Sequence, residues 1–411
     1  MLYLRVSRKI MTNSGKINLL IQNASLQFDR DKEKIYRVFP GSPLLISFVG
    51  TDNYFTLKKT LNELYNYNKE ISTTISYKNF EREIIKVIKN LIKENRKATD
   101  EDFQMIINDF LKLPIIENEV LHEIFGVVSD IPEKDFGKFS IYNLALAEDT
   151  LKRKFIFGSD FEYYFQDRKS DYFIGIRINA RDELKAKEIS YEICENVENI
   201  FNYMIGDLKH LRMVGILNYR NWISREILTC NKNKVNHSSE SDIKLLVDVN
   251  DSHFVKKTNG NGRIWKLLQK ENRTKVEERI MKSIFWIGNG VYDTSSSKAL
   301  LQFVFAIEGL LQYDIKSFIS QSIVSQLSES IAFILEDETE RRKEISKLFK
   351  KLYKERSAIA HGNHKNVEFE DLSIAFQLAK MLNIALLTKS PYCNFTSIEQ
   401  LYDQITDLKF K

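Results

Sequence analysis

The last third of the chain carries an unbroken series of apolar residues at helical spacing. Val276, Ile280, Ile284, Ile287 and Val291 recur at intervals of three and four residues, which places them on one face of a helix. Comparable stripes follow at 300–311, 319–334, 340–361 and 371–387, with Ser295–Ser297 able to cap the second helix. The connections are short and no strand pattern intervenes. The sequence therefore predicts an all-α helical bundle of about five helices.

The preceding half alternates between two patterns. Period-2 stretches predict strands at 16–28, 44–49, 71–77 and 172–178, and 3.6-residue periodicity predicts helices at 84–92 and from 182 to about 217. Polar segments rich in turn formers, 231–242 and 250–263, indicate a boundary. We therefore expect an α+β sensor or regulatory domain at 1–255 and the helical bundle at 265–411.

Composition limits the class of protein. The 411 residues include 43% hydrophobic ones, so the chain can build real cores, and the formal net charge of +5 permits a polyanionic partner. The three cysteines are odd in number and far apart, so they define neither a disulfide framework nor a metal site. With neither a signal peptide nor a membrane span expected, the sequence predicts a cytoplasmic protein.

One arginine breaks the pattern of the fourth predicted helix. Its inward stripe reads Ile345, Leu348, Phe349, Leu352 and Ile359, and the same spacing places Arg356 on that stripe. A buried guanidinium costs several kcal/mol unless it is paired. Glu308, which flanks the stripe of the second helix, is its expected partner.

His361 ends the same helix and is followed by Gly362, a residue that readily adopts the left-handed conformation closing a helix. An imidazole exchanges a proton near neutral pH, and an arginine supplies a permanent charge for a phosphate. Five helical positions leave Arg356 and His361 roughly 140° apart. Convergence therefore requires either a distorted helix end or a second subunit.

The spacing Arg-x4-His-Gly at the end of a penultimate helix resembles the signature of the HEPN superfamily. The amino-acid sequence of residues 352–362, together with the upstream helix around Phe305-Ala-Ile-Glu308, is similar to the Apea-like branch of this superfamily. That resemblance implies a metal-independent endoribonuclease that needs no cofactor, cuts single-stranded or loop RNA and acts as a homodimer. It also implies a role as a toxin in abortive infection against phage. Ser357 stands where many relatives carry a more strongly polar residue, and we include it as a supporting residue.

The helix leading to this motif is basic. Residues 341–356 contain eight lysines and arginines against two glutamates, a charge pattern suited to a phosphate backbone. We therefore expect contacts to RNA from four lysines: Lys347, Lys350, Lys351 and Lys354.

Two alternatives remain open. In the first, the bundle serves dimerisation and nucleotide or RNA binding without turnover. In the second, Asp171, Glu183 and Lys185 form a metal-dependent nuclease site in the first domain, which would require the Glu-x-Lys pair on a strand. The role of the first domain is open, and a phage protein acting on it as a trigger is one expectation.

Overall fold

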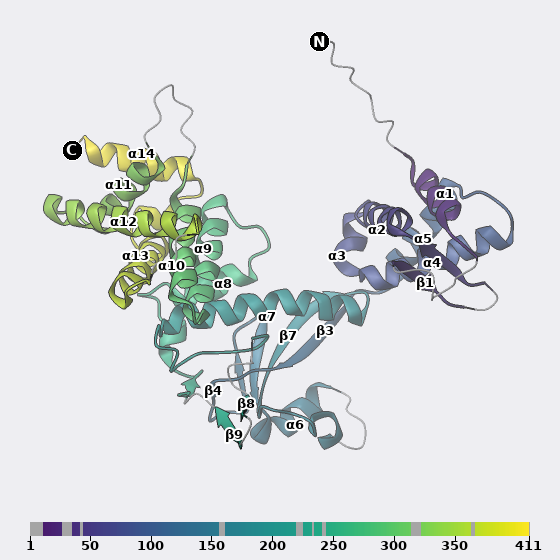
Figure 1. Cartoon of the computed structure of the whole chain (residues 1–411), viewed down its shortest axis with the longest axis horizontal. Coiled ribbons are helices and arrows are strands. Elements are labelled where there is room, and N and C mark those ends of the chain that lie inside the picture. The colour runs from purple at the N-terminus through teal and green to yellow at the C-terminus, as the bar shows by residue number, and fades with distance from the viewer. Residues whose placement is uncertain are drawn as a thin grey trace, which may run out of the picture. The chain divides into compact units, whose positions relative to one another are not determined.

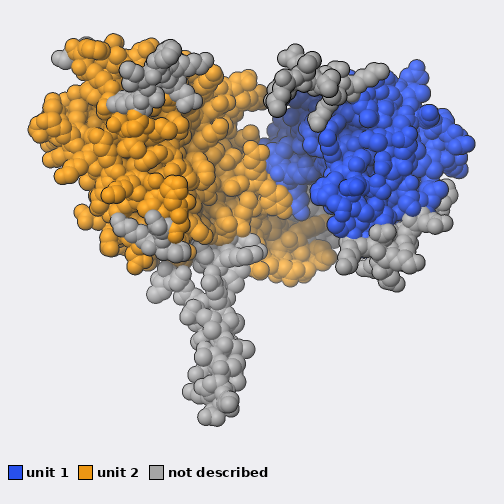
Figure 2. All heavy atoms as spheres, turned by 45° about the horizontal axis from the view of Figure 1, so that its top comes forward, with its two compact units in different colours: residues 1–120, 177–190 blue, residues 121–176, 191–411 orange. Residues whose placement is uncertain are grey.

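The computed structural model describes residues 11–26, 35–41, 44–155, 161–218, 225–231, 234–240, 244–313, 322–362 and 366–410 (Figure 1). Its contacts divide the chain into two compact units, coloured separately in Figure 2. Unit 1 comprises 1–120 and 177–190, and unit 2 comprises 121–176 and 191–411. The expected division at 255–265 thus falls inside unit 2.

Unit 1 is a small α/β assembly with one apolar core. Its helices are α1 (Asn13–Asn23), α2 (Thr51–Tyr65), α3 (Lys69–Thr74), α4 (Tyr77–Lys93) and α5 (Asp100–Lys112), and its antiparallel strands are β1 (Tyr36–Phe39) and β2 (Ile46–Val49). The core draws on α1, β2, α2, α4 and α5, and includes Ile17, Phe48, Leu61, Phe80, Ile84, Ile88 and Phe110.

Two predicted strands of this unit are helices. Residues 16–28 were expected to be extended, but α1 forms there behind Thr12, whose hydroxyl accepts the Gly15 N–H at 3.1 Å. Residues 71–77 overlap α3, in which Thr73 and Thr74 hydroxyls donate to carbonyls four residues earlier. The strand expected at 44–49 is confirmed as β2, and the helix expected at 84–92 as α4.

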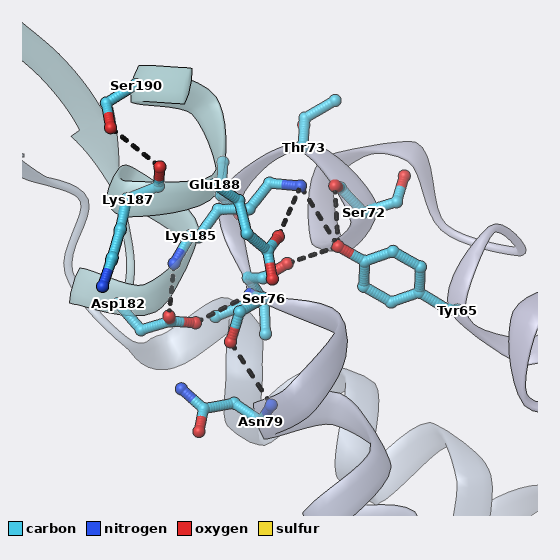
Figure 3. Close-up of polar contacts among 12 residues, drawn as sticks. Tyr65, Ser72, Thr73, Ser76, Asn79, Asp182, Lys185, Lys187, Glu188 and Ser190 are labelled. Atoms are coloured by element: carbon cyan, nitrogen blue, oxygen red, sulfur yellow. Dashed lines mark hydrogen bonds and ion pairs between the residues drawn. The ribbon is translucent and has the colours of Figure 1, made fainter. Parts of the chain in front are cut away.

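A polar network in unit 1 fixes the start of α7 (Glu183–Ile205), as Figure 3 shows. The Asp182 carboxylate accepts the Lys185 N–H and the Ser76 N–H, both at 2.8 Å, so it joins the first turn of α7 to that of α4. The Lys185 ammonium donates to the Tyr65 hydroxyl at 3.2 Å. Burial, followed by the charges of Glu188 and Asp182, raises the pKa of Tyr65 to about 12, so its hydroxyl stays protonated and donates to Ile75.

A four-stranded sheet in the order β3-β7-β6-β5 forms the centre of the middle region. Its strands are β3 (Ile116–Glu123), β5 (Glu133–Asp135), β6 (Phe139–Asn143) and β7 (Tyr172–Ala180), the last confirming the strand expected at 172–178. The remaining elements here are β4 (Val127–Val128), α6 (Leu144–Lys154), β8 (Arg225–Asn231), β9 (Lys234–Glu240), β10 (Val247–Asp248) and 3₁₀ turns at Glu162–Phe165 and Ser252–Val255. Strands β8 and β9 pair antiparallel, and β9 lies in the segment 231–242 that was expected to be irregular.

Aromatic rings connect this sheet to the helices of unit 2. Phe136 and Phe139 stack at 4.9 Å, and both contact Phe201 of α7 and Trp265 of α8 (Asn261–Gln269). The ring pairs contribute about 0.5–1.5 kcal/mol each beyond their burial. Helix α7 was expected to reach residue 217, but it ends at Ile205 because Gly206 takes a left-handed φ of 65°.

The expected helical bundle is present at the C-terminal end. It contains α8, α9 (Lys275–Tyr292), α10 (Ser296–Leu311), α11 (Ile323–Leu335), α12 (Thr339–Ala360), α13 (Phe369–Thr388) and α14 (Ile398–Lys409), with a 3₁₀ turn at Tyr392–Asn394. The expected stripes coincide with α9 to α13, although Ile319 lies outside the described residues. In α12, however, Leu348 of the expected inward stripe is exposed, and Glu355, which was not assigned to the stripe, is buried. Helices α8 and α14 were not anticipated. Because α13 and α14 both follow α12, the helix that ends at the Arg-x4-His-Gly motif is not the penultimate one, as was expected. The coarse fold is therefore an α/β N-terminal region followed by a helical C-terminal region, as expected.

Helices α7 and α9 cross at backbone contact inside unit 2. A Cβ built on Gly288 of α9 would lie 2.1 Å from the Asn199 carbonyl oxygen of α7. Real Cβ atoms do not approach a carbonyl so closely, so only glycine allows this crossing. The bundle is consequently packed against α7 as well as against itself.

Helix α13 is long and apolar enough to cross a membrane by length and composition, which the sequence analysis did not anticipate. Sixty-one per cent of its most apolar window is buried within the structure, and it packs against α9, α10 and α11. These contacts are those of a core helix.

Replacing Gly288 with alanine should destabilise the protein by about 3 kcal/mol, because α7 and α9 would have to separate to admit a methyl group. Gly309→Ala in α10 is a matched control, since nothing lies within 4 Å of a Cβ built there. We expect that change to be neutral or to stabilise by up to about 1 kcal/mol. Denaturant unfolding measures both, and equal stabilities of the two variants would contradict the close helix crossing.

Candidate functional site

Arg356 occupies the inward position predicted for it. Its Nη2 lies 3.1 Å from Oε2 of Glu308 on α10, and the two side chains are 23% and 13% exposed. The expected Arg356–Glu308 ion pair is therefore confirmed. The Arg356 Nε–H is shielded from solvent and has no acceptor among the described residues. The guanidinium thus retains donor capacity that the glutamate does not use.

Two aromatic rings complete the surroundings of this ion pair. The Arg356 guanidinium lies 4.9 Å from the Phe305 ring centroid and 5.5 Å from that of Tyr353. Both contacts are within the range of cation–π attraction. Burial, and after it the Glu308 carboxylate, raises the pKa of Tyr353, which keeps its hydroxyl protonated. The site is thus an arginine held between one carboxylate and two rings.

His361 lies at the C-cap of α12 and is exposed. Its N–H donates to the Ser357 carbonyl at 3.1 Å, so the half-buried Ser357 contributes its backbone to the helix end. Gly362 follows with φ of 85°, the left-handed conformation expected from the sequence. The imidazole therefore stands at a defined helix end in contact with solvent.

Arg356 and His361 do not share a face of α12. The helix is regular up to Ala360, so the roughly 140° between the two positions is not removed by a distortion before His361. The first of the two expected routes to convergence, a distorted helix, is absent over these residues. A second copy of the chain is the remaining route.

The four predicted RNA-binding lysines fall into two environments. Lys347 and Lys350 line a groove of about 680 Å³ between α11, α12 and α14, together with Arg342, Lys343 and Lys409. Lys351 instead forms an ion pair with the buried Asp371 at the start of α13, which raises the pKa of the lysine. Lys354 is exposed outside the groove.

The helix geometry links these lysines to the histidine. At about 100° per residue, Lys347, Lys350, Lys354 and His361 lie within about 60° of one another around α12. Arg356 lies at least about 120° from each of them. One face of α12 is therefore a row of cations that ends at an exposed imidazole, and another face carries the half-buried arginine.

Sequence reasoning missed the rings and the acid around these residues. Tyr353 lies three residues before Arg356, and Phe305 lies three before Glu308, a spacing that places each on the same helix face as its charged neighbour. That three-residue spacing could have predicted that both rings lie next to the ion pair. Nothing local marked Asp371 as the partner of Lys351.

The metal-dependent alternative required Glu183 and Lys185 on a strand, but both lie in the first turn of α7. Lys185 is engaged with Tyr65 and Glu188, and Asp171 pairs with Arg168 at 3.1 Å. Within the described ranges, no group of three or more His, Cys, Asp and Glu side chains is arranged to hold a metal ion. These contacts assign Lys185 a structural role.

No protein-family model, curated protein or solved structure matches this chain.

Removing the carboxylate of Glu308 should destabilise the protein by about 1–3 kcal/mol, because a mostly buried guanidinium would lose its counter-charge. Exchanging both Glu308 and Arg356 for leucine should recover much of that loss. The control is Glu340→Ala, which breaks the exposed Glu340–Lys343 pair of α12 and should change stability by less than about 0.5 kcal/mol. Thermal or denaturant melting would show whether Glu308→Ala differs from this control, and no difference would mean that the pair is energetically neutral.

Proposed function

We propose that this protein is a metal-independent endoribonuclease of the HEPN type that cuts single-stranded or loop RNA in the cytoplasm. The supporting observation is the arrangement on α12: a row of lysines ends at the exposed His361, and the partly exposed Arg356 side chain pairs with Glu308 through Nη2. The resemblance to Apea-like HEPN proteins points to the same chemistry and to anti-phage defence by abortive infection.

In the proposed reaction, the neutral His361 imidazole removes the proton of a ribose 2'-hydroxyl. The 2'-oxygen attacks the adjacent phosphorus, the bond to the 5'-oxygen breaks, and that oxygen takes the proton carried by the His361 imidazolium. Arg356 stabilises the negative charge on the non-bridging phosphoryl oxygens, for which its unused donors are suited. The products are a 2',3'-cyclic phosphate end and a 5'-hydroxyl end. Every step uses side chains of this protein and requires no cofactor.

The divergence of Arg356 and His361 within one helix supports a site shared between two copies. In a symmetric homodimer, each copy contributes the same surface, so an arginine of one subunit can meet the histidine of the other. The lysine row would then guide RNA toward the shared cleft.

The alternative is a HEPN module that binds RNA or nucleotides and dimerises without turnover. The Arg356–Glu308 ion pair favours this alternative, because a guanidinium already paired with a carboxylate has less charge to offer a transition state. Both proposals require a nucleotide phosphate at the site, and only the first requires cleavage of RNA.

His361→Ala should lower RNA cleavage by about 10²- to 10⁴-fold, as expected for loss of a general acid or base, with the melting temperature nearly unchanged because the side chain is exposed. Cleavage of total RNA by the purified wild-type protein should persist in EDTA. Gel analysis and thermal melting test both points. Full cleavage by a less stable His361→Ala protein would make the histidine structural, and cleavage abolished by EDTA would indicate a metal-dependent nuclease.

Mixing two inactive variants tests the shared site. In a heterodimer of Arg356→Ala and His361→Ala chains, one of the two composite sites retains both wild-type residues. Random exchange of subunits should therefore restore about a quarter of wild-type cleavage. Each variant alone supplies the control. If the mixture stays as inactive as its components while light scattering shows heterodimers, the two residues do not act across the interface.

A further inference from the structure

A second basic surface lies in unit 1, on residues that the proposed function does not use. A groove of about 690 Å³ runs between β1 and α4. Six cationic side chains line it: Arg37, Lys78, Arg82, Lys86, Lys89 and Lys93. Glu81 is the only carboxylate among its lining residues, and it forms an ion pair with Arg37 at 2.8 Å. The groove therefore carries a strong excess of positive charge.

We propose that this groove binds the sugar–phosphate backbone of a single-stranded nucleic acid. The α4 cations recur at intervals of four, four, three and four residues, so they lie within about 80° around the helix. The apolar residues Phe80, Ile84 and Ile88 of the same helix are fully buried in the core. The basic row therefore has a fixed direction, because the buried face holds α4 in place.

An exposed row of charge on a helix is often only a solvated face, but this row forms one wall of a concavity. Strand β1 provides the opposite wall, and the Lys89 ammonium donates to the Pro40 carbonyl at 2.8 Å, which ties α4 to the end of that strand. The cations of α4 and Arg37 consequently face a shared space. Such convergence of like charges is unfavourable unless an anion offsets it.

The β1 wall also offers a surface for a base. Phe39 is half-buried, and the Arg37 guanidinium lies 5.3 Å from its ring centroid. A line of cations beside an aromatic ring and an arginine plane is the arrangement by which proteins bind single strands with little sequence preference. Asn79 and Asn90, which also line the groove, add neutral donors.

Lys78 and Lys93 mark the two ends of the row, and neither has an ion-pair partner among the residues that the structure describes. Lys86 lies 3.4 Å from Glu83, a weak exposed pair that a phosphate can displace. The three lysines are therefore available to a ligand. They are also exposed, so replacing them should leave the core of unit 1 intact.

The test measures binding of the full-length protein to a fluorescent single-stranded oligodeoxynucleotide, which lacks the 2'-hydroxyl and cannot undergo the proposed cleavage. Three changes are combined, Lys78→Gln, Lys86→Gln and Lys93→Gln. Loss of three phosphate contacts should weaken binding on the order of 100-fold at 0.1 M monovalent salt and reduce the slope of log K against log salt concentration by about 2. This result is independent of whether the protein cuts RNA.

The matched control replaces Lys59, Lys69 and Lys97 with glutamine. These exposed lysines belong to the same unit and lie outside the groove, so the net charge changes equally. Equal weakening by both triple variants would reduce the effect to net charge and overturn the proposal. Tighter binding of duplex RNA, or of vesicles containing anionic lipid, than of the single strand would also overturn it.

Photocrosslinking of the wild-type chain to a 5-bromouracil-containing oligodeoxynucleotide gives a second measurement that does not depend on variant folding. Peptides containing Phe39 or residues 78–93 are expected among the crosslinked products. Crosslinks confined to residues 191–411 would show that the strand is bound by unit 2 alone, and the groove of unit 1 would then have no such role.

Discussion

The packing of unit 2 depends on one place where two helix backbones touch. Because position 288 has no side chain, α9 approaches the Asn199 carbonyl of α7 to a distance that any larger residue would forbid. That approach brings Phe201 of α7 into the aromatic cluster of the sheet and α8. At the end of α7, the Met204 carbonyl accepts a hydrogen bond from Lys380 of α13 at 3.1 Å. Burial lowers the pKa of Lys380 to about 8, which is consistent with an ammonium packed among rings. Sheet and bundle therefore share one core.

The chemistry of α12 follows from how its faces are divided. A charge that is removed from water needs a counter-charge, and Glu308 supplies one to Arg356. This ion pair uses Nη2 of the guanidinium and leaves its other nitrogen donors free of the glutamate. The exposed lysines need no such partner, with the exception of Lys351, whose acid is buried. A phosphate approaching Arg356 would meet one carboxylate and two rings, whereas one approaching the lysine row would meet several cations and, in the groove, the Glu329 carboxylate that pairs with Lys409. The two faces thus differ in how tightly, and how specifically, they can hold an anion.

Elements with apolar periodicity over several turns were predicted correctly from the sequence. The prediction was wrong for segments in which side-chain hydrogen bonds decide between helix and strand. Helices α9 to α13 extend over several turns, so their stripes were unambiguous, and the Arg356–Glu308 pair followed from them. Residues 71–77 have strand-like composition, yet Thr73 and Thr74 satisfy carbonyls of their own helix, a local choice that apolar spacing does not reveal. Strands β8 and β9 escaped notice because their polar residues show no alternation. The angle of roughly 140° between Arg356 and His361 was predicted from their spacing in a regular helix, but apolar periodicity gives no information on whether another chain joins them.

The single uninterrupted helix α7 contributes residues 183–190 to unit 1 and 191–205 to unit 2. Neither unit is therefore one continuous stretch of the gene. A truncated protein ending near residue 120 would lack the Asp182 carboxylate that accepts the Ser76 N–H at the start of α4. One beginning near residue 265 would leave the Gly288 surface of α9 uncovered, together with the indole of Trp265. A fragment that begins at the boundary suggested by composition would therefore expose apolar surface, and soluble expression should require residues on both sides of that boundary.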